Sequence, residues 1–175
     1  MQAFGAGAWG LAKVLTDTGR FESSSLAFAV VLAVAAWALR SDRLRRAAIA
    51  CLLAGVVAGI AVSVARPALG RARPNSDIEP GFYWMEMRAE LGSMPSGHAA
   101  TNSASAVAIA VTFPPLAPVV LAYAGGVGWS RMQLNVHYPT DILWGTMLGA
   151  SIGLAIGVAT RDRRRTDASR VFPRR

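Results

Sequence analysis

Cysteine and charge are both scarce in this chain of 175 residues. Only 16% of the residues are charged, whereas 53% are hydrophobic; an ordinary soluble domain has roughly 25% charged residues. The single cysteine, Cys51, lies inside an apolar segment, which excludes a disulfide framework or a cysteine metal site, and we expect it to pack as a small apolar residue. No basic stretch precedes a short apolar run at the N-terminus, so no removable signal peptide is predicted. The length suits a single domain, 1–175.

Two long runs contain no charge at all, Ala47–Ala65 and Ile142–Thr160. Each is close to the ~20 residues that cross a bilayer core. A soluble protein of this size has no interior in which several helices with an apolar surface all round could be buried. The chain is therefore predicted to be an all-α, polytopic membrane helix bundle.

About five transmembrane helices are predicted, at roughly 24–40, 47–65, 98–113, 116–130 and 140–160. The uncharged stretch 99–129 is too long for one crossing, and Pro114 and Pro115 divide it, because proline interrupts a helix. Residues 3–15 carry apolar side chains at helical spacing, which indicates an interfacial helix before the first span.

Arginine makes up almost all of the basic side chains behind the net charge of +8. One group lies between the first two predicted spans (Arg40, Arg43, Arg45 and Arg46), and another lies in the tail 161–175. With five spans both groups fall on one side, which the positive-inside rule makes cytoplasmic. This distribution favours topology and anionic headgroups over nucleic-acid binding. It predicts a multi-pass protein of the inner (plasma) membrane with a cytoplasmic C-terminus.

The opposite side also carries arginines, against that rule, and a bound anion would explain them. Three polar clusters lie there: Arg66, six residues, Arg73-Pro74; then Pro95-Ser96-Gly97-His98; then Ser130-Arg131, five residues, His137, three residues, Asp141. Arginine forks match phosphate oxygens, and a helix that begins at Ser-Gly offers free N–H groups to an anion. Bound at such a site, a phosphate would lie on the non-cytoplasmic face.

The two histidines of the chain fit a nucleophile and an acid. Asp141 follows His137 by four residues, so its carboxylate can reach the imidazole, fix the tautomer and leave the other nitrogen free to attack. His98 could protonate the leaving oxygen. Simpler explanations exist for each residue alone: a capping histidine, a Ser-Gly turn, or Arg66 and Arg71 reaching toward headgroups. Together they do not explain why both histidines gather with the arginines.

The three clusters resemble the signature of the type 2 phosphatidic-acid phosphatase (PAP2) superfamily, over 66–141. The resemblance implies that His137 forms a phosphohistidine, Asp141 orients it, and His98 protonates the lipid oxygen and later activates water. It also implies that phosphoryl oxygens are held by Arg66, Arg73, Ser96, Gly97 and Arg131, with no metal and no cofactor. The first position is usually lysine in that family and is Arg66 here, which keeps the charge but alters the geometry.

The resemblance leaves the substrate open among polyprenyl (di)phosphates, phosphatidylglycerol phosphate, phosphatidic acid and a lipid A phosphate. A lipid phosphotransferase is the alternative, and a non-catalytic lipid-binding protein is disfavoured by the intact clusters. No obligatory protein partner is evident. The aromatic segment 82–85 would guide lipid chains or simply anchor the loop. Gly145, Gly149 and Gly153 predict close helix contact, within the bundle in preference to between subunits.

Overall fold

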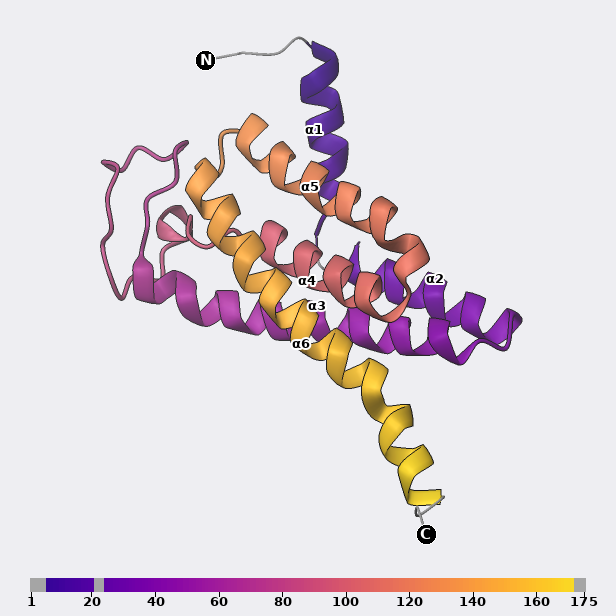
Figure 1. Ribbon diagram of the computed structural model, residues 1–175. Coiled ribbons are helices and arrows are strands. Elements are labelled where there is room, and N and C mark those ends of the chain that lie inside the picture. The colour runs from indigo at the N-terminus through magenta and orange to yellow at the C-terminus, as the bar shows by residue number, and fades with distance from the viewer. Residues whose placement is uncertain (1–5, 21–23, 172–175) are drawn as a thin grey trace.

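The computed structural model describes the backbone of residues 6–20 and 24–171 and the side chains of 7–20 and 24–161 (Figure 1). This part of the chain is helical, and its only β-type pairing is an isolated antiparallel bridge between Arg71 and Phe82. The helices are α1 (Ala6–Thr18), α2 (Ser25–Ala38), α3 (Asp42–Leu69), α4 (Gly97–Thr112), α5 (Ala117–Gln133) and α6 (Pro139–Val171), with 3-10 turns at Ala89–Leu91 and Pro114–Leu116. The predicted all-α class is confirmed.

The helix boundaries follow local signals in the sequence. α3 begins after Ser41, whose hydroxyl accepts a hydrogen bond from the Leu44 N–H at 3.4 Å. It ends at Gly70, whose φ of 56° lies in the left-handed region that favours glycine. Arg43, Arg45 and Arg46 therefore lie in the first turns of α3, not in the preceding turn as expected. The break predicted at Pro114 separates α4 from α5.

The two ends of the chain differ from the expected boundaries. α1 lies where an interfacial helix was predicted, although residues 1–5 are outside the described part. α6 runs on to Val171, so most of the predicted tail 161–175 continues the helix; residues 172–175 are not described. Whether that basic segment faces the cytoplasm stays a prediction.

α4 and α6 pack in parallel through a row of glycines. A Cβ on Gly145 would lie 2.5 Å from the Ser96 carbonyl oxygen, and Cβ atoms on Gly149 and Gly153 would overlap the carbonyls of Ala100 and Ala104. Each α6 glycine thus meets an α4 carbonyl one turn further along. Such an approach is possible only without side chains, as at helix crossings in membranes. The contact expected within the bundle is present.

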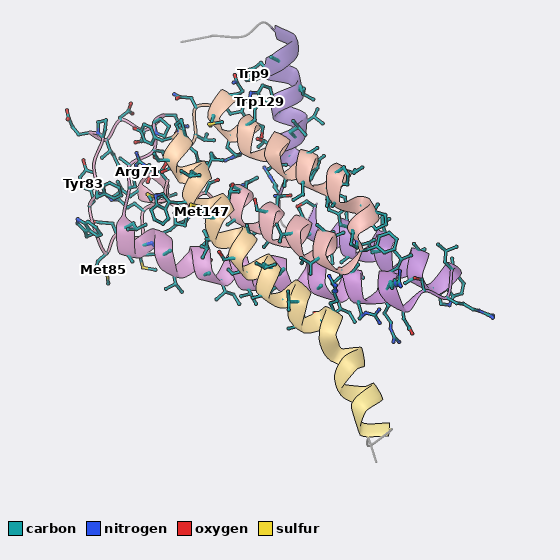
Figure 2. The ribbon with its side chains drawn as sticks, viewed as in Figure 1. Trp9, Arg71, Tyr83, Met85, Trp129 and Met147 are labelled. Carbon is teal, nitrogen blue, oxygen red and sulfur yellow. The ribbon has the colours of Figure 1, made fainter. Side chains whose placement is uncertain are left out.

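Most of the large hydrophobic side chains lie on the outer surface of the bundle, not in its interior. Buried residues of the core are mostly alanine, whereas large aliphatic and aromatic side chains point outward, including Trp37 (83% exposed) and Val64 (70%). Figure 2 labels three other exposed side chains of this kind, Trp9, Met85 and Met147. Such a continuous apolar exterior marks a lipid-facing surface. By length and composition, α3 and the Pro139–Arg161 part of α6 could each cross a membrane, and α2 is a shorter apolar helix. The number of crossings stays a prediction.

The residues of the three predicted polar clusters lie at one end of the bundle. α3 and α5 end there, α4 and α6 begin there, and the loop from Gly70 to Ser96 lies over this end (Figure 1). The C-terminal end of α1 also reaches it, since the Thr16 hydroxyl lies 2.8 Å from that of Ser130, near the end of α5. The helix directions therefore bring distant segments of the chain to one place.

Candidate active site

All three predicted clusters meet at this end of the bundle. The Ser96 N–H donates to the Asp141 carbonyl at 3.0 Å, which joins the second cluster to the third. Arg73 Nη1 donates to the Val136 carbonyl at 3.3 Å, which joins the first to the third. The arrangement forms one site from residues far apart in the sequence.

His137 lies in the turn between α5 and α6 and is 3% exposed. Its Nδ1 is 2.8 Å from the Ser93 carbonyl oxygen. A carbonyl only accepts hydrogen bonds, so Nδ1 carries the proton and a neutral ring has its lone pair on Nε2. Nε2 is buried and has no hydrogen-bond partner within the described residues. This is the orientation that a histidine nucleophile requires.

Asp141 was expected to bond the imidazole directly, and the structure differs in that detail. Its Oδ2 is 3.7 Å from His137 Nδ1, close enough for an ion pair but longer than a hydrogen bond. Ser93 supplies the hydrogen bond instead, because its carbonyl is nearer. The carboxylate therefore stabilises a charged ring by proximity, while a backbone group fixes the tautomer.

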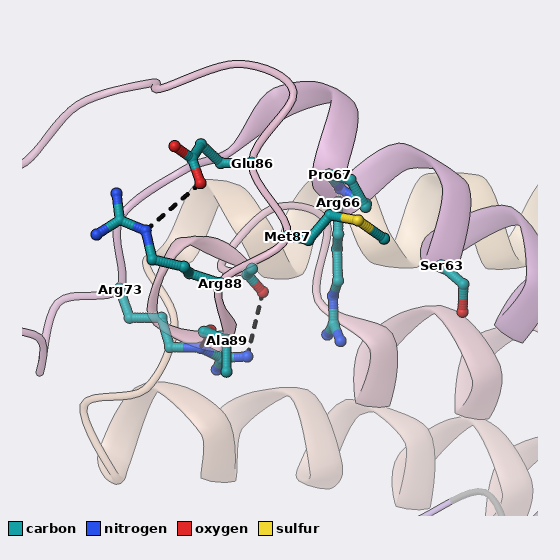
Figure 3. Close-up of a pocket in the computed structure, with 9 residues that line it drawn as sticks. Ser63, Arg66, Pro67, Arg73, Glu86, Met87, Arg88 and Ala89 are labelled. Carbon is teal, nitrogen blue, oxygen red and sulfur yellow. Dashed lines mark hydrogen bonds and ion pairs between the residues drawn. The ribbon is translucent and has the colours of Figure 1, made fainter.

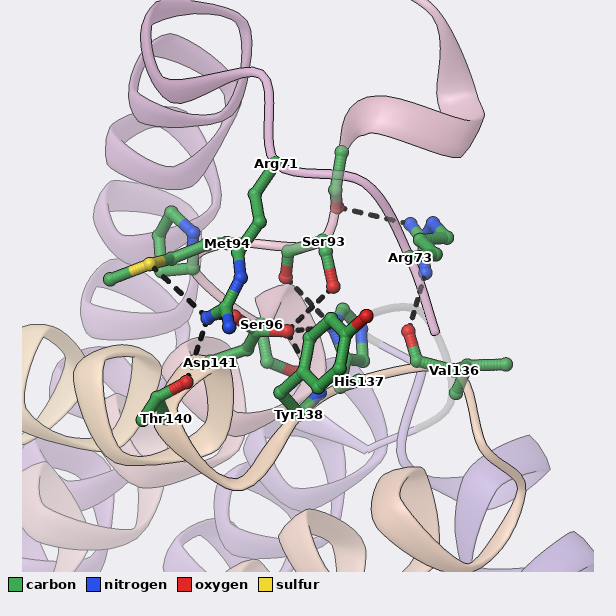
Figure 4. Close-up of polar contacts among 12 residues, drawn as sticks. Arg71, Arg73, Ser93, Met94, Ser96, Val136, His137, Tyr138, Thr140 and Asp141 are labelled. Atoms are coloured by element: carbon green, nitrogen blue, oxygen red, sulfur yellow. Dashed lines mark hydrogen bonds and ion pairs between the residues drawn. The ribbon is translucent and has the colours of Figure 1, made fainter. Parts of the chain in front are cut away.

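The Asp141 carboxylate is fully buried and held by three donors (Figure 4). The Ser93 hydroxyl donates to Oδ2 at 2.6 Å, and the Tyr138 N–H donates to the same oxygen at 2.9 Å. Arg71 Nη1 donates to Oδ1 at 2.6 Å and forms an ion pair. A buried carboxylate needs this pairing to remain charged.

Arg71 and Ser93 were not among the predicted site residues. The Arg71 guanidinium also donates to the Thr140 hydroxyl at 2.7 Å. It lies 4.4 Å from the Tyr138 ring centroid and 5.4 Å from that of Phe82, within cation–π range of both. In the sequence, Arg71 stood out only as a basic residue on the predicted non-cytoplasmic side, against the positive-inside rule. This was the one signal that could have identified it as a site residue. Nothing in the sequence pattern distinguished Ser93.

His98 is the second residue of α4 and has a different support. Its backbone carbonyl accepts from Asn102 Nδ2 at 2.9 Å, and the same amide donates to the Gly19 carbonyl, just beyond α1, at 2.8 Å. The ring nitrogen Nε2 is buried without a partner among the described residues. Arg131, His137 and Arg66 are close enough to act on His98 electrostatically. Both histidines thus have a buried Nε2 without a partner in the described part of the chain.

The predicted phosphate-binding residues surround these rings. Arg66 Nε donates to the Pro95 carbonyl at 3.1 Å, and its guanidinium lies against Gly97, where a Cβ would be only 2.9 Å from Nη2. The absence of a side chain at Gly97 therefore makes room for Arg66. Arg131 has a buried Nε without a partner in the described part of the chain. These guanidiniums have donors available for an anion.

Arg73 and Ser96 have structural partners as well. Arg73 donates to the carbonyls of Ala89, Val136 and Gly92, at 2.9, 3.3 and 3.2 Å. Burial lowers the pKa of its guanidinium, while Asp141 and Glu90 raise it. Ser96 is fully buried and caps α4, accepting from the Ala99 N–H at 3.5 Å. α4 therefore begins at the site, with the positive end of its dipole there.

His137 is held in its neutral form. Burial is the largest cause that lowers the pKa of the ring, and the charges of Arg73, Arg131 and Arg66 lower it further. The contact with Asp141 opposes them. Since the pKa falls below the ordinary value of about 6.5, the ring is unprotonated at neutral pH and can act as a nucleophile.

A pocket of about 300 Å³ opens beside the site, between the end of α3 and the loop (Figure 3). Its lining combines arginines with less polar residues: Ser63, Arg66, Pro67, Arg73, Glu86, Met87, Arg88, Ala89 and Gly92. Arg88 Nε is 3.4 Å from a Glu86 carboxylate oxygen. Within the described residues no group of three His, Cys, Asp or Glu side chains could hold a metal ion. The pocket can hold a group that is partly anionic and partly apolar.

Comparisons with known proteins agree on a family and a fold. The family profile described as the PAP2 superfamily matches residues 47–165. A solved structure, the first transmembrane PAP2 type phosphatidylglycerolphosphate phosphatase from Bacillus subtilis, has a TM-score of 0.67 at 19% identity, covering 92% of this chain and 80% of that one. At that identity the likeness concerns the fold alone.

Two proteins of known name are similar to this chain in sequence. The lipid A 1-phosphatase of Rhizobium johnstonii is 30% identical over 106 residues, which cover 59% of this chain and 43% of that protein. The decaprenylphosphoryl-5-phosphoribose phosphatase of Mycolicibacterium smegmatis is 32% identical over 134 residues, or 77% of this chain and 69% of that protein. The matched part is thus less than half of the first relative's length.

Proposed function

Since the chain belongs to the PAP2 superfamily, we propose that it is an integral membrane phosphatase that hydrolyses a phosphomonoester or diphosphate of an envelope lipid. One observation supports this most directly. The rings of His98 and His137 lie at one site, each with a buried Nε2 that has no hydrogen-bond partner among the described residues. A nucleophile and an acid are needed there, and arginines surround both.

The first step transfers the phosphoryl group to His137. Its Nε2 lone pair forms a bond to phosphorus as the bond from phosphorus to the lipid oxygen breaks. His98, protonated on Nε2, gives that proton to the departing oxygen. The products are a phosphohistidine and a lipid alcohol, or a lipid monophosphate when the substrate is a diphosphate.

The second step returns the enzyme to its starting state. A water molecule attacks phosphorus, His98 Nε2 accepts the water proton, and the bond to His137 Nε2 breaks. Inorganic phosphate leaves and His98 is again protonated. Throughout, Asp141 stabilises the positive charge that develops on the His137 ring.

Charge on the transferring group is met by arginines and backbone N–H groups, without a metal ion. Arg66, Arg73 and Arg131 supply guanidinium donors, and Ser96 and Gly97 begin α4 at the site. Preorganised donors of this kind stabilise a transition state because they need no reorientation during the reaction. Arg66 takes the place of the usual lysine, with its guanidinium beside Gly97.

The substrate class is a lipid phosphate, for which polyprenyl (di)phosphates, phosphatidylglycerol phosphate, phosphatidic acid and a lipid A phosphate are candidates. The names of both relatives refer to lipid-linked phosphates. The pocket beside Arg66 has Met87, Ala89 and Pro67 in its lining, which suits the region where a headgroup meets its chain. No protein partner or nucleic acid is required.

The same proposal gives an orientation in the inner (plasma) membrane. Arginines at the α2–α3 turn and in 161–175 lie on the cytoplasmic side, and the active site faces the opposite side. Arg88 is more than half exposed on the site loop, whereas the single native cysteine, Cys51, is buried. In an Arg88→Cys variant, an impermeant thiol reagent should label intact cells from outside; labelling only after permeabilisation would contradict this orientation.

The test of the function is phosphate release from a panel of purified lipid phosphates in detergent, with EDTA present. We expect release by the wild-type chain and none by His137→Ala. Release only when a second lipid is added as acceptor would indicate a phosphotransferase instead. Release that EDTA abolishes would contradict the metal-free mechanism.

A further inference from the structure

The end of α1 reaches the active site, although α1 lies outside the part of the chain that matches the family profile. That match begins at residue 47, and α1 covers Ala6–Thr18. The proposed reaction assigns no role to its residues. Its contacts with α4 beside His98 therefore call for an explanation.

Two hydrogen-bonded contacts fix the end of α1 against the site. The Thr16 hydroxyl lies 2.8 Å from that of Ser130, near the end of α5. Asn102 Nδ2 donates to the Gly19 carbonyl at 2.8 Å and to the His98 carbonyl at 2.9 Å. One amide group thus joins the end of α1 to the first turn of α4.

Gly19 lets α1 approach α5 closely. A Cβ at this position would lie 2.6 Å from Val127 Cγ1 and 2.8 Å from the Leu15 carbonyl oxygen. Real Cβ atoms essentially never show contacts this short, so a side chain at Gly19 would displace the end of α1. Gly10, on the same helix, has nothing within 4 Å of a Cβ.

We propose that residues Thr16–Gly19 are a positioning element for His98, holding the first turn of α4 through Asn102 so that the His98 ring stays at the site. The arrangement differs from that of His137, whose ring is held directly by the Ser93 carbonyl. This inference rests on the proposed function, in which His98 is the acid.

The charges near the end of α1 bear on the same site. Asp17 and Arg20 lie 3.9 Å apart and both act electrostatically on Arg131. The outer face of α1 carries Trp9, Leu11 and Val14, each more than half exposed. α1 therefore has an apolar face available to the bilayer interface and an inner end in contact with the site.

The experiment separates positioning of the acid from general damage by using two leaving groups. An alkyl lipid phosphate needs protonation of its departing oxygen, whereas nitrophenyl phosphate has a good leaving group and needs little. The value of kcat/KM reports the steps through phosphoryl transfer, so it is measured for both substrates with the full chain. Wild-type hydrolysis of the alkyl substrate tests the proposed function on its own.

Gly19→Ala should lower kcat/KM for the alkyl phosphate by roughly tenfold or more, part of the 10²–10⁴ that general acid catalysis contributes. The value for nitrophenyl phosphate should change by about threefold or less, since that reaction depends little on the acid. Gly10→Ala, the matched control, should leave both unchanged. In a His98→Ala background, Gly19→Ala should add no further selective loss.

An equal loss on both substrates, or no loss on either, would overturn the inference while leaving the proposed function intact. If Gly19→Ala does not accumulate as folded protein, Asn102→Ala carries the same test, because it removes the amide between Gly19 and His98 without adding bulk. Thermal unfolding of each variant identifies the folded proteins to be compared.

Discussion

The two histidines of the site are supported in unlike ways. His137 belongs to a network of charged and polar side chains, with Asp141, Arg71 and Ser93 held by bonds of 2.6 to 2.8 Å. His98 has no carboxylate in its described contacts, and its backbone is joined to the end of α1 through Asn102. The nucleophile is fixed by buried ion pairing and the acid by helix packing. Substitutions on the two sides should therefore differ in their dependence on the leaving group.

The largest effect should come from His137→Ala, which removes the nucleophile. We expect kcat to fall by at least about a thousandfold, on alkyl and aryl phosphates alike, because the group that forms the covalent intermediate is removed. Wild-type protein incubated with ³²P-labelled lipid and quenched in alkaline detergent should carry an acid-labile, alkali-stable label that is absent from the variant. Label retained by His137→Ala would place the nucleophile elsewhere.

Asp141→Asn should come next, with kcat lowered on the order of a hundredfold or more, as expected for a carboxylate that stabilises an imidazolium. The loss should again be independent of the leaving group, in contrast to that of Gly19→Ala. Kinetics on the same two substrates check this. A selective loss on the alkyl phosphate would connect Asp141 to His98 and remove the distinction between the two sides.

Arg71→Lys should have a smaller effect, with kcat lowered by about tenfold or less. Lysine keeps the charge beside Asp141 but loses the planar group between Tyr138 and Phe82, a stacking worth about 0.5–2 kcal/mol. Arg71→Met leaves the carboxylate unpaired and should also lower the unfolding temperature. If Arg71→Lys is kinetically silent and Arg71→Met is not, charge alone explains the role of Arg71.

The smallest expected effect is a shift in the pH dependence of kcat/KM when Arg73 is replaced. Because burial lowers the pKa of His137, kcat/KM should stay high below pH ~6.5, the ordinary histidine value, and fall only as the pH approaches the lowered pKa and the ring becomes protonated. Arg73 contributes to that lowering, so Arg73→Gln should move the acid limb to higher pH. Arg88→Gln is the control, since Arg88 is not among the groups that act on His137. An unchanged acid limb in Arg73→Gln would show that another group titrates.

Much of the fold could be predicted because its signals are local. The uncharged run Ala47–Ala65 lies within α3, the prolines at 114 and 115 separate α4 from α5, and the boundaries expected for the other helices agree to within a few residues. The extension of α6 to Val171 was missed, since hydropathy ends at the membrane surface and a polar helix can continue beyond it.

The functional side chains of the site were predicted from the sequence, but the residues that hold them in place were not. The three clusters do meet, and Gly97 does admit Arg66. Ser93 and Gly19 act through backbone carbonyls, which every residue has, so no pattern of residue types could identify them. Arg71 pairs with Asp141 across a long stretch of chain, and only the folded structure brings the two together.

The glycine row between α4 and α6 sets the spacing of the catalytic groups. Gly145, Gly149 and Gly153 each meet a carbonyl of α4, and Gly157 lies against Val111 and Ala108 in the next turn. Sliding α6 by one such step would move it by about 6 Å, four residues at 1.5 Å each. His137 and Asp141 would move by the same distance relative to His98.

The row of glycines therefore fixes the register of α6 against α4 as well as forming a packing surface. A single-residue insertion between Gly145 and Gly153 would rotate the remaining glycines away from α4, because one residue turns a helix by about 100°. The same insertion beyond Gly157 would leave the row aligned. Tolerance to length changes along α6 should thus rise abruptly past Gly157, although no residue near that point takes part in the reaction.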